Sequence, residues 1–443
     1  MAYDIWEVFG FSSNPYDQGQ LPADERGSRL LSGRGIQIRK IQRLIGSRGS
    51  HALVEGPVGA GKTSLVNVAM YRMYRETLQE KNSVLWLPAV SSFQLDRDID
   101  EFESDFYRTV IQTLIAHSED ISSARLGSLN LEQIKRWLNS PEYKTRTLGV
   151  GASIISGNMG IGRQANSTKG FEESGFPVFV RNLMTEIFRG GQRGGIICVL
   201  DNLEIVKKSG DARDGLDALR DRLFNIPEVR WVLCGARGVL ARARTPRLSG
   251  IFMAPENVPP LLDDEVAGAI RLRIEEFGSE KMKIPLAPEN FEFIYTILNR
   301  NLRDSMSWSQ SFAHWLIDEY PELDFPHSVT EMKEVLVDWL AGRARESYEQ
   351  IKDVRPRSWS YFTDLCNAGG IGYVDEYRKF KFGRRDALNR SMSELLDANL
   401  TVKEVDPEDP NREMHTVTAA GYLLDFYHNA LGIPDGKIDD ISL

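Results

Sequence analysis

The sequence is poor in cysteine and has no long apolar run. Its 443 residues include only three cysteines, and Cys198 and Cys234 lie inside apolar runs typical of buried strands. This pattern indicates small core side chains in a reducing compartment, without the cysteine spacing of a metal site. No apolar stretch is long enough to span a bilayer. The first residues carry neither the basic nor the apolar region of a secretory signal. We therefore expect a cytoplasmic protein that does not enter the membrane.

The sequence also lacks the excess of positive charge found in proteins that coat nucleic acid without specificity. It has 54 Lys and Arg against 63 Asp and Glu, a net charge of −9. Any contact with DNA must therefore come from a local basic patch. The remaining composition is that of a globular protein, and the length predicts two or three domains with hydrophobic cores.

One strong motif is present, the stretch GPVGAGKT at residues 56–63. It matches the phosphate-loop pattern G-x-x-x-x-G-K-[ST] at every required position. Residues 51–55 before it resemble a buried strand, and residues 64–71 after it show helical spacing, so a helix N-terminus would face the phosphates. We expect Lys62 to reach the β- and γ-phosphates of ATP and the Thr63 hydroxyl to hold Mg²⁺. The full set of expected phosphate-binding residues is Gly56, Pro57, Gly59, Ala60, Gly61, Lys62, Thr63 and Ser64.

The pattern of apolar residues predicts an α/β fold followed by helices. Four short apolar runs, at residues 51–55, 83–88, 195–201 and 229–235, indicate a parallel sheet with helices on both faces. After Pro255 the strand pattern stops and helical spacing takes over, at 263–277, 288–300, 302–320 and 329–350. We expect four parts: an N-terminal lead-in at 1–50, an α/β core at 51–255, a helical lid domain at 256–350 and a C-terminal domain at 351–443.

The α/β core is expected to contain an insertion around residues 95–175, because Thr63 and Asp201 are separated by more chain than one crossover needs. Residues 147–162 within it are rich in glycine and predict a hairpin loop. A surface that contacts DNA or a neighbouring subunit is the alternative.

Asp201 ends the apolar run 196–200, which is the place of a Walker B aspartate. Its carboxylate would then hold the Mg²⁺ shell beside Thr63. Asn202 follows directly, where many such enzymes have glutamate, and an amide orients water but does not take its proton. Glu204 is the nearest carboxylate, and it either activates water or caps the next element. Slow hydrolysis, typical of a switch and not of a motor, is the expectation.

Taken in order, these motifs resemble an AAA+ ATPase. The residues that carry the resemblance are Gly33-Arg34, GPVGAGKT, LDNLE at 200–204, CGAR at 234–237 and NLRD at 301–304. Within that class the chain is most similar to origin-recognition-type replication initiators, transposition regulators and related STAND-like signalling ATPases, over about residues 10–320. The resemblance implies ATP and Mg²⁺ as cofactors and a homo-oligomeric assembly.

The resemblance also implies roles for several further residues. Tyr16 and Arg34 match the segment that packs on adenine. Arg303 matches the lid arginine called sensor 2, which reaches the γ-phosphate, although a surface helix charge is the alternative. Sensor 1 would fall near residues 235–237. Arg244 and Arg247 are candidates for an arginine finger that reaches the next subunit's ATP. Arg220 and Arg222 compete for that role, and a solvated basic loop is an equal alternative.

The last 90 or so residues predict a winged helix. A helix at 384–399 is followed by strands at 400–405 and 413–418 and by a final helix. Candidate DNA contacts are Lys381, Arg384, Arg385 and Arg390. Five acidic residues within 403–413 would repel a phosphate backbone, so docking of a protein is the alternative.

We therefore expect an ATP-controlled switch that engages DNA through its winged helix. A STAND-type signalling or phage-defence ATPase, whose winged helix binds a protein partner encoded nearby, is the alternative.

Overall fold

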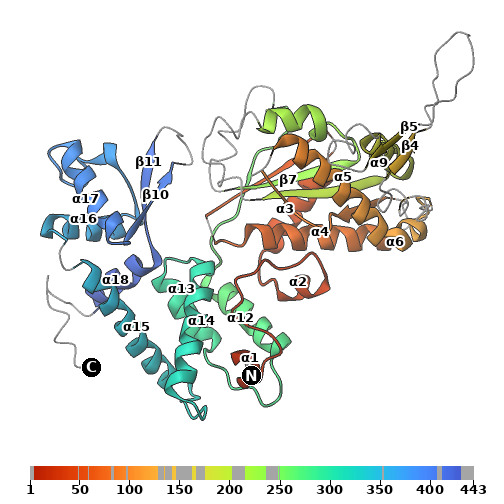
Figure 1. The fold of residues 1–443 in the computed structure, drawn as a ribbon. Coiled ribbons are helices and arrows are strands. Elements are labelled where there is room, and N and C mark those ends of the chain that lie inside the picture. The colour runs from red at the N-terminus through yellow and green to blue at the C-terminus, as the bar shows by residue number, and fades with distance from the viewer. Residues whose placement is uncertain are drawn as a thin grey trace, which may run out of the picture.

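A parallel sheet lies at the centre of the α/β part of the computed structural model (Figure 1). The structure describes residues 4–47, 49–57, 59–80, 84–95, 98–127, 134, 142–145, 162–165, 175–201, 215–235, 248, 250–351, 354–406 and 412–430. The strand order is β2-β6-β7-β1-β8, with β3 also pairing with β6. These strands are β1 (Ala52–Glu55), β2 (Leu85–Pro88), β3 (Phe93–Gln94), β6 (Gly194–Asp201), β7 (Val229–Gly235) and β8 (Glu256–Asn257). Every pairing between them is parallel.

Helices cover both faces of this sheet, as the apolar runs predicted. Alternate residues of one strand point to opposite faces, so Val54 and Val199 pack with α3 (Gly35–Gly46) and α4 (Lys62–Gln79). Leu53 and Leu200 pack on the other side with α5 (Ile99–Ala116) and α9 (Phe176–Phe188). Smaller elements complete this part of the chain: α2 (Glu25–Leu30), α6 (Ser118–Ser123) and the π-helical turn η2 (Arg220–Phe224).

Four helices follow the sheet, close to the expected positions. They are α12 (Asp263–Phe277), α13 (Pro288–Ile297), α14 (Leu302–Glu319) and α15 (Val329–Ile351). The expectation that strands stop after Pro255 is wrong, because β8 pairs with β1 just beyond that proline. A strand of only two residues carries no periodic signal that sequence analysis can detect.

The N-terminal residues belong to two different places in the fold. The segment with α1 (Ile5–Val8) packs on the helical domain, where Phe11 forms a β-bridge with Gly278. The Tyr16 hydroxyl donates to the Leu286 carbonyl oxygen at 2.6 Å. Helices α2 and α3 instead pack against α4. Residues 1–50, expected as a single lead-in, are therefore divided between the helical domain and the α/β core (Figure 1).

The C-terminal part is a winged helix, as predicted. Its elements are α16 (Pro356–Asn367), β9 (Ile371–Tyr373), the 3-10 turn η3 (Val374–Glu376), α17 (Arg385–Asp397), β10 (Thr401–Val405), β11 (Glu413–Val417) and α18 (Ala419–Ala430). The strands form an antiparallel sheet in the order β10-β11-β9. The sequence analysis did not identify β9, whose three residues sit between a glycine pair and a turn. The predicted fold class, an α/β parallel sheet with a helical domain and a winged helix, is confirmed.

Helix α18 returns to the helical domain and ties the winged helix to it. The Phe293 and Phe426 rings meet edge to face with centroids 5.7 Å apart. The Tyr427 hydroxyl donates to the Val337 carbonyl oxygen at 2.5 Å. An aromatic contact and a hydrogen bond of this kind are expected to limit free rotation between these two parts.

The glycine-rich stretch 147–162 lies outside the described residues, except for Gly162 at its end. On either side of it, β4 (Glu142–Thr145) and β5 (Gly162–Ala165) pair antiparallel. Within the described ranges, no helix combines the length and the apolar character that a membrane span requires.

Candidate functional site

The phosphate loop turns sharply between β1 and α4. Gly59 and Gly61 have φ angles of +79° and +80°, in the left-handed region that favours glycine. Gly61 is the N-cap of α4, so the first amides of the helix, at Lys62, Thr63 and Ser64, have no partner within the helix. Backbone amides at the start of a helix and the helix dipole together favour binding of a phosphate anion.

The Lys62 side chain lies across the loop. It is only 8 % exposed, and its ammonium donates to the carbonyl oxygens of Gly56 at 3.1 Å and Pro57 at 3.0 Å. The positive charge is therefore held over the loop that is expected to surround the phosphates. A phosphate oxygen bound there would receive a charge-assisted hydrogen bond.

Thr63 and Asp201 meet at the edge of the sheet where β6 ends. The Thr63 hydroxyl donates to Asp201 Oδ2 at 2.9 Å, and Asp201 is 2 % exposed. A hydroxyl and a carboxylate are oxygen ligands of the kind Mg²⁺ takes when it enters with a nucleotide and keeps several waters. The described residues hold no group of three or more His, Cys, Asp or Glu that would form a metal cage of their own. This pair therefore fits a Mg²⁺ ion that arrives with phosphate ligands.

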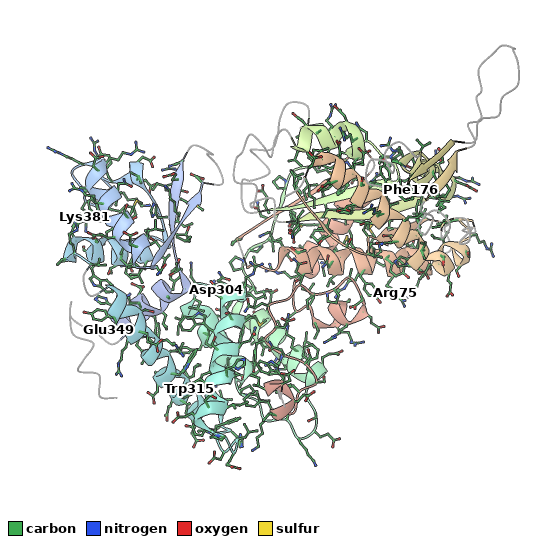
Figure 2. The ribbon with its side chains drawn as sticks, in the orientation of Figure 1. Arg75, Phe176, Asp304, Trp315, Glu349 and Lys381 are labelled. Atoms are coloured by element: carbon green, nitrogen blue, oxygen red, sulfur yellow. The ribbon has the colours of Figure 1, made fainter. Side chains whose placement is uncertain are left out.

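The helical domain contacts the phosphate loop at the start of α14. Asn301 is the N-cap of this helix, and its Oδ1 accepts from the Asp304 amide at 3.2 Å. Figure 2 labels Asp304 on the part of the helical domain that faces the α/β core. A Cβ atom added to Gly59 would lie 2.3 Å from that same Asn301 Oδ1. The two domains are thus in van der Waals contact at a glycine that has no room for a side chain.

This contact predicts different effects for two neighbouring substitutions. Gly61→Ala places a Cβ in open space, so it is expected to cost only the left-handed strain, about 1 kcal/mol of unfolding free energy. Gly59→Ala carries the same strain and also displaces the oxygen that caps α14, for about 2 kcal/mol in total. Urea unfolding of both variants without nucleotide measures the difference. Equal losses would show that Asn301 does not rest on Gly59 in solution.

The two domains line one open pocket. Lys62, Thr63 and Asp201 line it from the core, and Arg303 lines it from α14. Arg303 is exposed, and the described part of the chain shows no ion pair for it. The structure therefore brings the expected phosphate, metal and lid residues around one space.

Among the pocket residues that were not identified from the sequence, two contribute polar groups to the site. Arg273 on α12 is 8 % exposed, and it donates to the Asp17 carbonyl oxygen at 2.8 Å. Burial lowers its pKa, while the nearby Asp17 carboxylate acts in the opposite direction. A buried guanidinium beside Lys62 and Arg303 gives the pocket the positive charge that suits a polyphosphate. The second residue is Gln20, whose side-chain amide donates to Asp201 Oδ2 at 3.0 Å.

The residues expected beside adenine do not line this pocket. The Tyr16 side chain is 0 % exposed and stacks on Phe291, with ring centroids 6.3 Å apart. Its faces are therefore already occupied, and a contact between its ring and a base does not fit this structure. Arg34 is buried with φ of +64°, and it donates to the Ala60 carbonyl oxygen at 3.3 Å. It supports the phosphate loop from outside the pocket.

Several other expected residues are not placed by the structure. Asn202, Glu204, Arg244 and Arg247 lie outside the described residues, as does Arg237. Of the competing finger candidates, Arg222 forms ion pairs with Asp100 and Glu103 of its own chain. These carboxylates already satisfy its charge, which makes Arg222 a weak candidate for reaching another subunit.

The candidate DNA contacts form an exposed basic surface on the winged helix. Lys381, Arg384, Arg385 and Arg390 are all exposed, and no ion pair to them is found in the described ranges. Figure 2 places Lys381 on the outer side of this domain, away from the α/β core. Arg384 is the N-cap residue of α17, so this surface surrounds the start of the helix expected to contact DNA.

The acidic wing is partly neutralised by its own cations. Arg412 pairs with Asp406 and Asp375, and its guanidinium lies 3.6 Å from the centroid of the Tyr373 ring. Lys403 pairs with Glu413 at 2.7 Å. The repulsion expected from the wing is therefore smaller than the count of acidic residues suggested.

Comparison by sequence yields no relatives: no family model matches the chain, and the search of curated proteins also found no match. Comparison of structures yields similar folds. One is the ORC1 protein of Aeropyrum pernix in complex with DNA, which is 15% identical with a TM-score of 0.39 and covers 92% of this chain and 98% of that chain.

The ORC2 protein of Aeropyrum pernix, solved as ADPNP-ADP complexes, is 10% identical with a TM-score of 0.46 and covers 94% of this chain and 98% of that one. The replication initiator DnaA, solved with AMPPCP and single-stranded DNA, is 12% identical with a TM-score of 0.34 and covers 82% and 88% respectively. Proteins of the origin-recognition type, which the sequence motifs resemble, are therefore among the solved structures similar to this chain.

Proposed function

We propose that this chain is an AAA+ molecular switch that binds ATP with Mg²⁺ and engages DNA through its winged helix. The observation that carries the proposal is the composition of the pocket. Lys62, Thr63 and Asp201 of the core line it together with Arg303 of the helical domain. A nucleotide in this pocket would touch both domains and so influence how they sit together.

The residues of the pocket have separate tasks in this proposal. The amides of residues 59–64 and the Lys62 ammonium bind the phosphates, and Arg303 approaches the γ-phosphate from the lid. Thr63 and Asp201 would hold the cation, which would offset the negative charge of the phosphates. Weak ATP hydrolysis is part of the proposal, with Glu204 or Asn202 orienting the attacking water.

Assembly of several copies is also part of the proposal. Arg244 and Arg247 remain the candidates for an arginine finger, because they follow β7 in the sequence, where the resemblance to AAA+ ATPases places such an arginine. A bound γ-phosphate would then connect one subunit to the next. We place this assembly in the cytoplasm.

The DNA contact is proposed from the charge of the α17 surface. Exposed cations without carboxylate partners gain most from phosphate contacts, because no internal ion pair must be broken first. Lys381, Arg384 and Arg385 lie exposed at or just before the start of α17. The proposed ligand is double-stranded DNA.

The paired substitution Arg384→Ala/Arg385→Ala is expected to weaken duplex binding about tenfold at low salt in the presence of ATP. It should also reduce the slope of log affinity against log salt by about 2, because two phosphate contacts are lost. Fluorescence anisotropy with a labelled duplex over a salt series measures both quantities. The matched control is Arg29→Ala/Arg271→Ala, which removes the same charge from exposed positions of α2 and α12. Equal effects of the two pairs would rule out a specific role for α17.

A protein partner for the winged helix is the second candidate, as in a STAND-type signalling ATPase. Ile371 and Val402 are 41% and 43% exposed, and both lie opposite Thr416 in the β10-β11-β9 sheet. Residues directly opposite one another point to the same face, so these side chains form an exposed apolar row. Absence of salt-sensitive duplex binding at low salt would favour this candidate.

A further inference from the structure

The N-terminal segment forms a strap, residues 17–21, along one side of the pocket. At its start, Arg273 of the helical domain donates to the Asp17 carbonyl oxygen at 2.8 Å. At its end, the backbone amide of Leu21 donates to Ser64 Oγ at 3.0 Å. The side-chain amide of Asn67 donates to the Leu21 carbonyl oxygen at 2.9 Å. The strap is therefore bound to both domains that form the pocket.

Gln20 connects the strap to the carboxylate expected to hold the cation. Its Nε2 donates to Asp201 Oδ2 at 3.0 Å, and the same oxygen accepts the Thr63 hydroxyl at 2.9 Å. Gln20 is an exposed residue whereas Asp201 is buried. Core packing therefore does not force this contact, and the hydrogen bond to Asp201 itself accounts for where the Gln20 amide lies.

An amide donor and a divalent cation compete for the oxygens of one carboxylate. The Gln20 N–H group directs its positive end at Asp201, where Mg²⁺ would add a second positive charge. The cation also needs oxygen lone pairs, and the two present donors occupy those of Asp201 Oδ2. The Gln20 contact and a cation at Asp201 therefore oppose each other energetically.

We propose that Gln20 is a positioning residue that fastens the strap to Asp201 in the metal-free protein and is displaced when Mg²⁺ enters with the nucleotide. This inference rests on the proposed function, since it requires a magnesium nucleotide in this pocket. Release of Gln20 removes one contact of the strap with the core, while Leu21 stays bound to Ser64 and Asn67. The strap is then held less firmly in the presence of nucleotide with magnesium than with nucleotide alone.

The test compares Gln20→Ala with Gln79→Ala as the matched control. Both glutamines are exposed, and Gln79 lies at the end of α4, outside the pocket. Isothermal titration calorimetry with ADP is run once with excess Mg²⁺ and once with EDTA. Gln20→Ala is expected to bind Mg·ADP about tenfold more tightly than the parent, because no charge-assisted hydrogen bond is broken. Its affinity in EDTA should equal that of the parent, and Gln79→Ala should change neither value.

Hydrogen exchange of a peptide spanning the strap gives a second readout that does not depend on affinity. In the parent protein, exchange should rise when Mg·ADP replaces ADP with EDTA. In Gln20→Ala it should be high under both conditions. If the ratio of the affinity for Mg·ADP to the affinity for ADP in EDTA is the same in the parent and in Gln20→Ala, the inference is wrong. The proposed function would still stand. Failure of the parent to bind ADP under either condition would overturn both.

Discussion

Replacing Lys62 with alanine is expected to weaken ATP binding about 100-fold, or by about 3 kcal/mol. The Lys62 ammonium is buried over the loop on two carbonyl oxygens, and a bound phosphate would give it an anionic partner. Removing it leaves the phosphate charge in a partly buried pocket with one cation fewer. Calorimetric titration with a slowly hydrolysed ATP analogue measures the loss.

Lys40→Ala is the matched control for this substitution. Lys40 lies on α3 and pairs with Glu256 at 2.9 Å, outside the pocket. The control removes the same charge, so its affinity for the analogue should match that of the parent. Thermal unfolding of both variants shows whether they fold. An Lys62→Ala protein that is folded and binds the analogue as tightly as the parent would refute the nucleotide site.

Acidification from pH 6.5 to pH 4 is expected to cost the fold about 3 kcal/mol through a single side chain, His51. Its Nδ1 accepts from the Trp231 amide at 3.2 Å, and its Nε2 therefore carries the proton and donates to the Phe224 carbonyl oxygen at 2.8 Å. Burial lowers the pKa of His51 from 6.5 to about 4, and nearby Arg230 acts in the same direction. The unfolded chain takes up the proton first, so stability is complete above pH 6.5 and falls towards pH 4.

Urea unfolding of the parent and of His51→Gln across this pH range measures the effect. The amide of glutamine has a donor and an acceptor but no proton to gain, so the variant should be less stable at pH 7 yet lose less on acidification. His314→Gln, at an exposed position of α14, is the control for removing a histidine. The same loss between pH 6.5 and pH 4 in His51→Gln and the parent would contradict the assignment.

The sequence predicted the elements whose residues repeat with a regular period. The run Ile196–Leu200 was identified as a buried strand because every position is apolar, and Asp201 at its end marked the edge of the sheet. Helix α12 was predicted with its observed ends because an apolar stripe and a following glycine define them. By contrast, β8 and β9 have two and three residues, and only their pairing partners identify them as strands.

The candidate site was predictable where function requires a contiguous motif, and not where distant segments meet. Lys62 and Thr63 belong to one motif, whereas Gln20 and Asp201 are 181 positions apart. Gln20 lies in a polar stretch with glycine that looks like any surface loop. Arg273 looks like an exposed helix charge until the fold places the N-terminal segment over it. Tyr16 was assigned to adenine by resemblance, but packing against Phe291 decides where its ring lies.

The contact between Tyr16 and Leu286, which are 270 positions apart, determines when the helical domain can be completed. During synthesis the N-terminal segment leaves the ribosome early, yet its binding surface on α13 emerges only after the entire parallel sheet has been made. The α/β core has all of its strands by residue 257 and is able to fold first. Until α13 has been made, the nascent chain leaves three apolar side chains exposed, those of Trp6, Phe9 and Tyr16. A chaperone that shields this segment in the nascent chain would therefore protect the helical domain, although the segment is made hundreds of residues earlier.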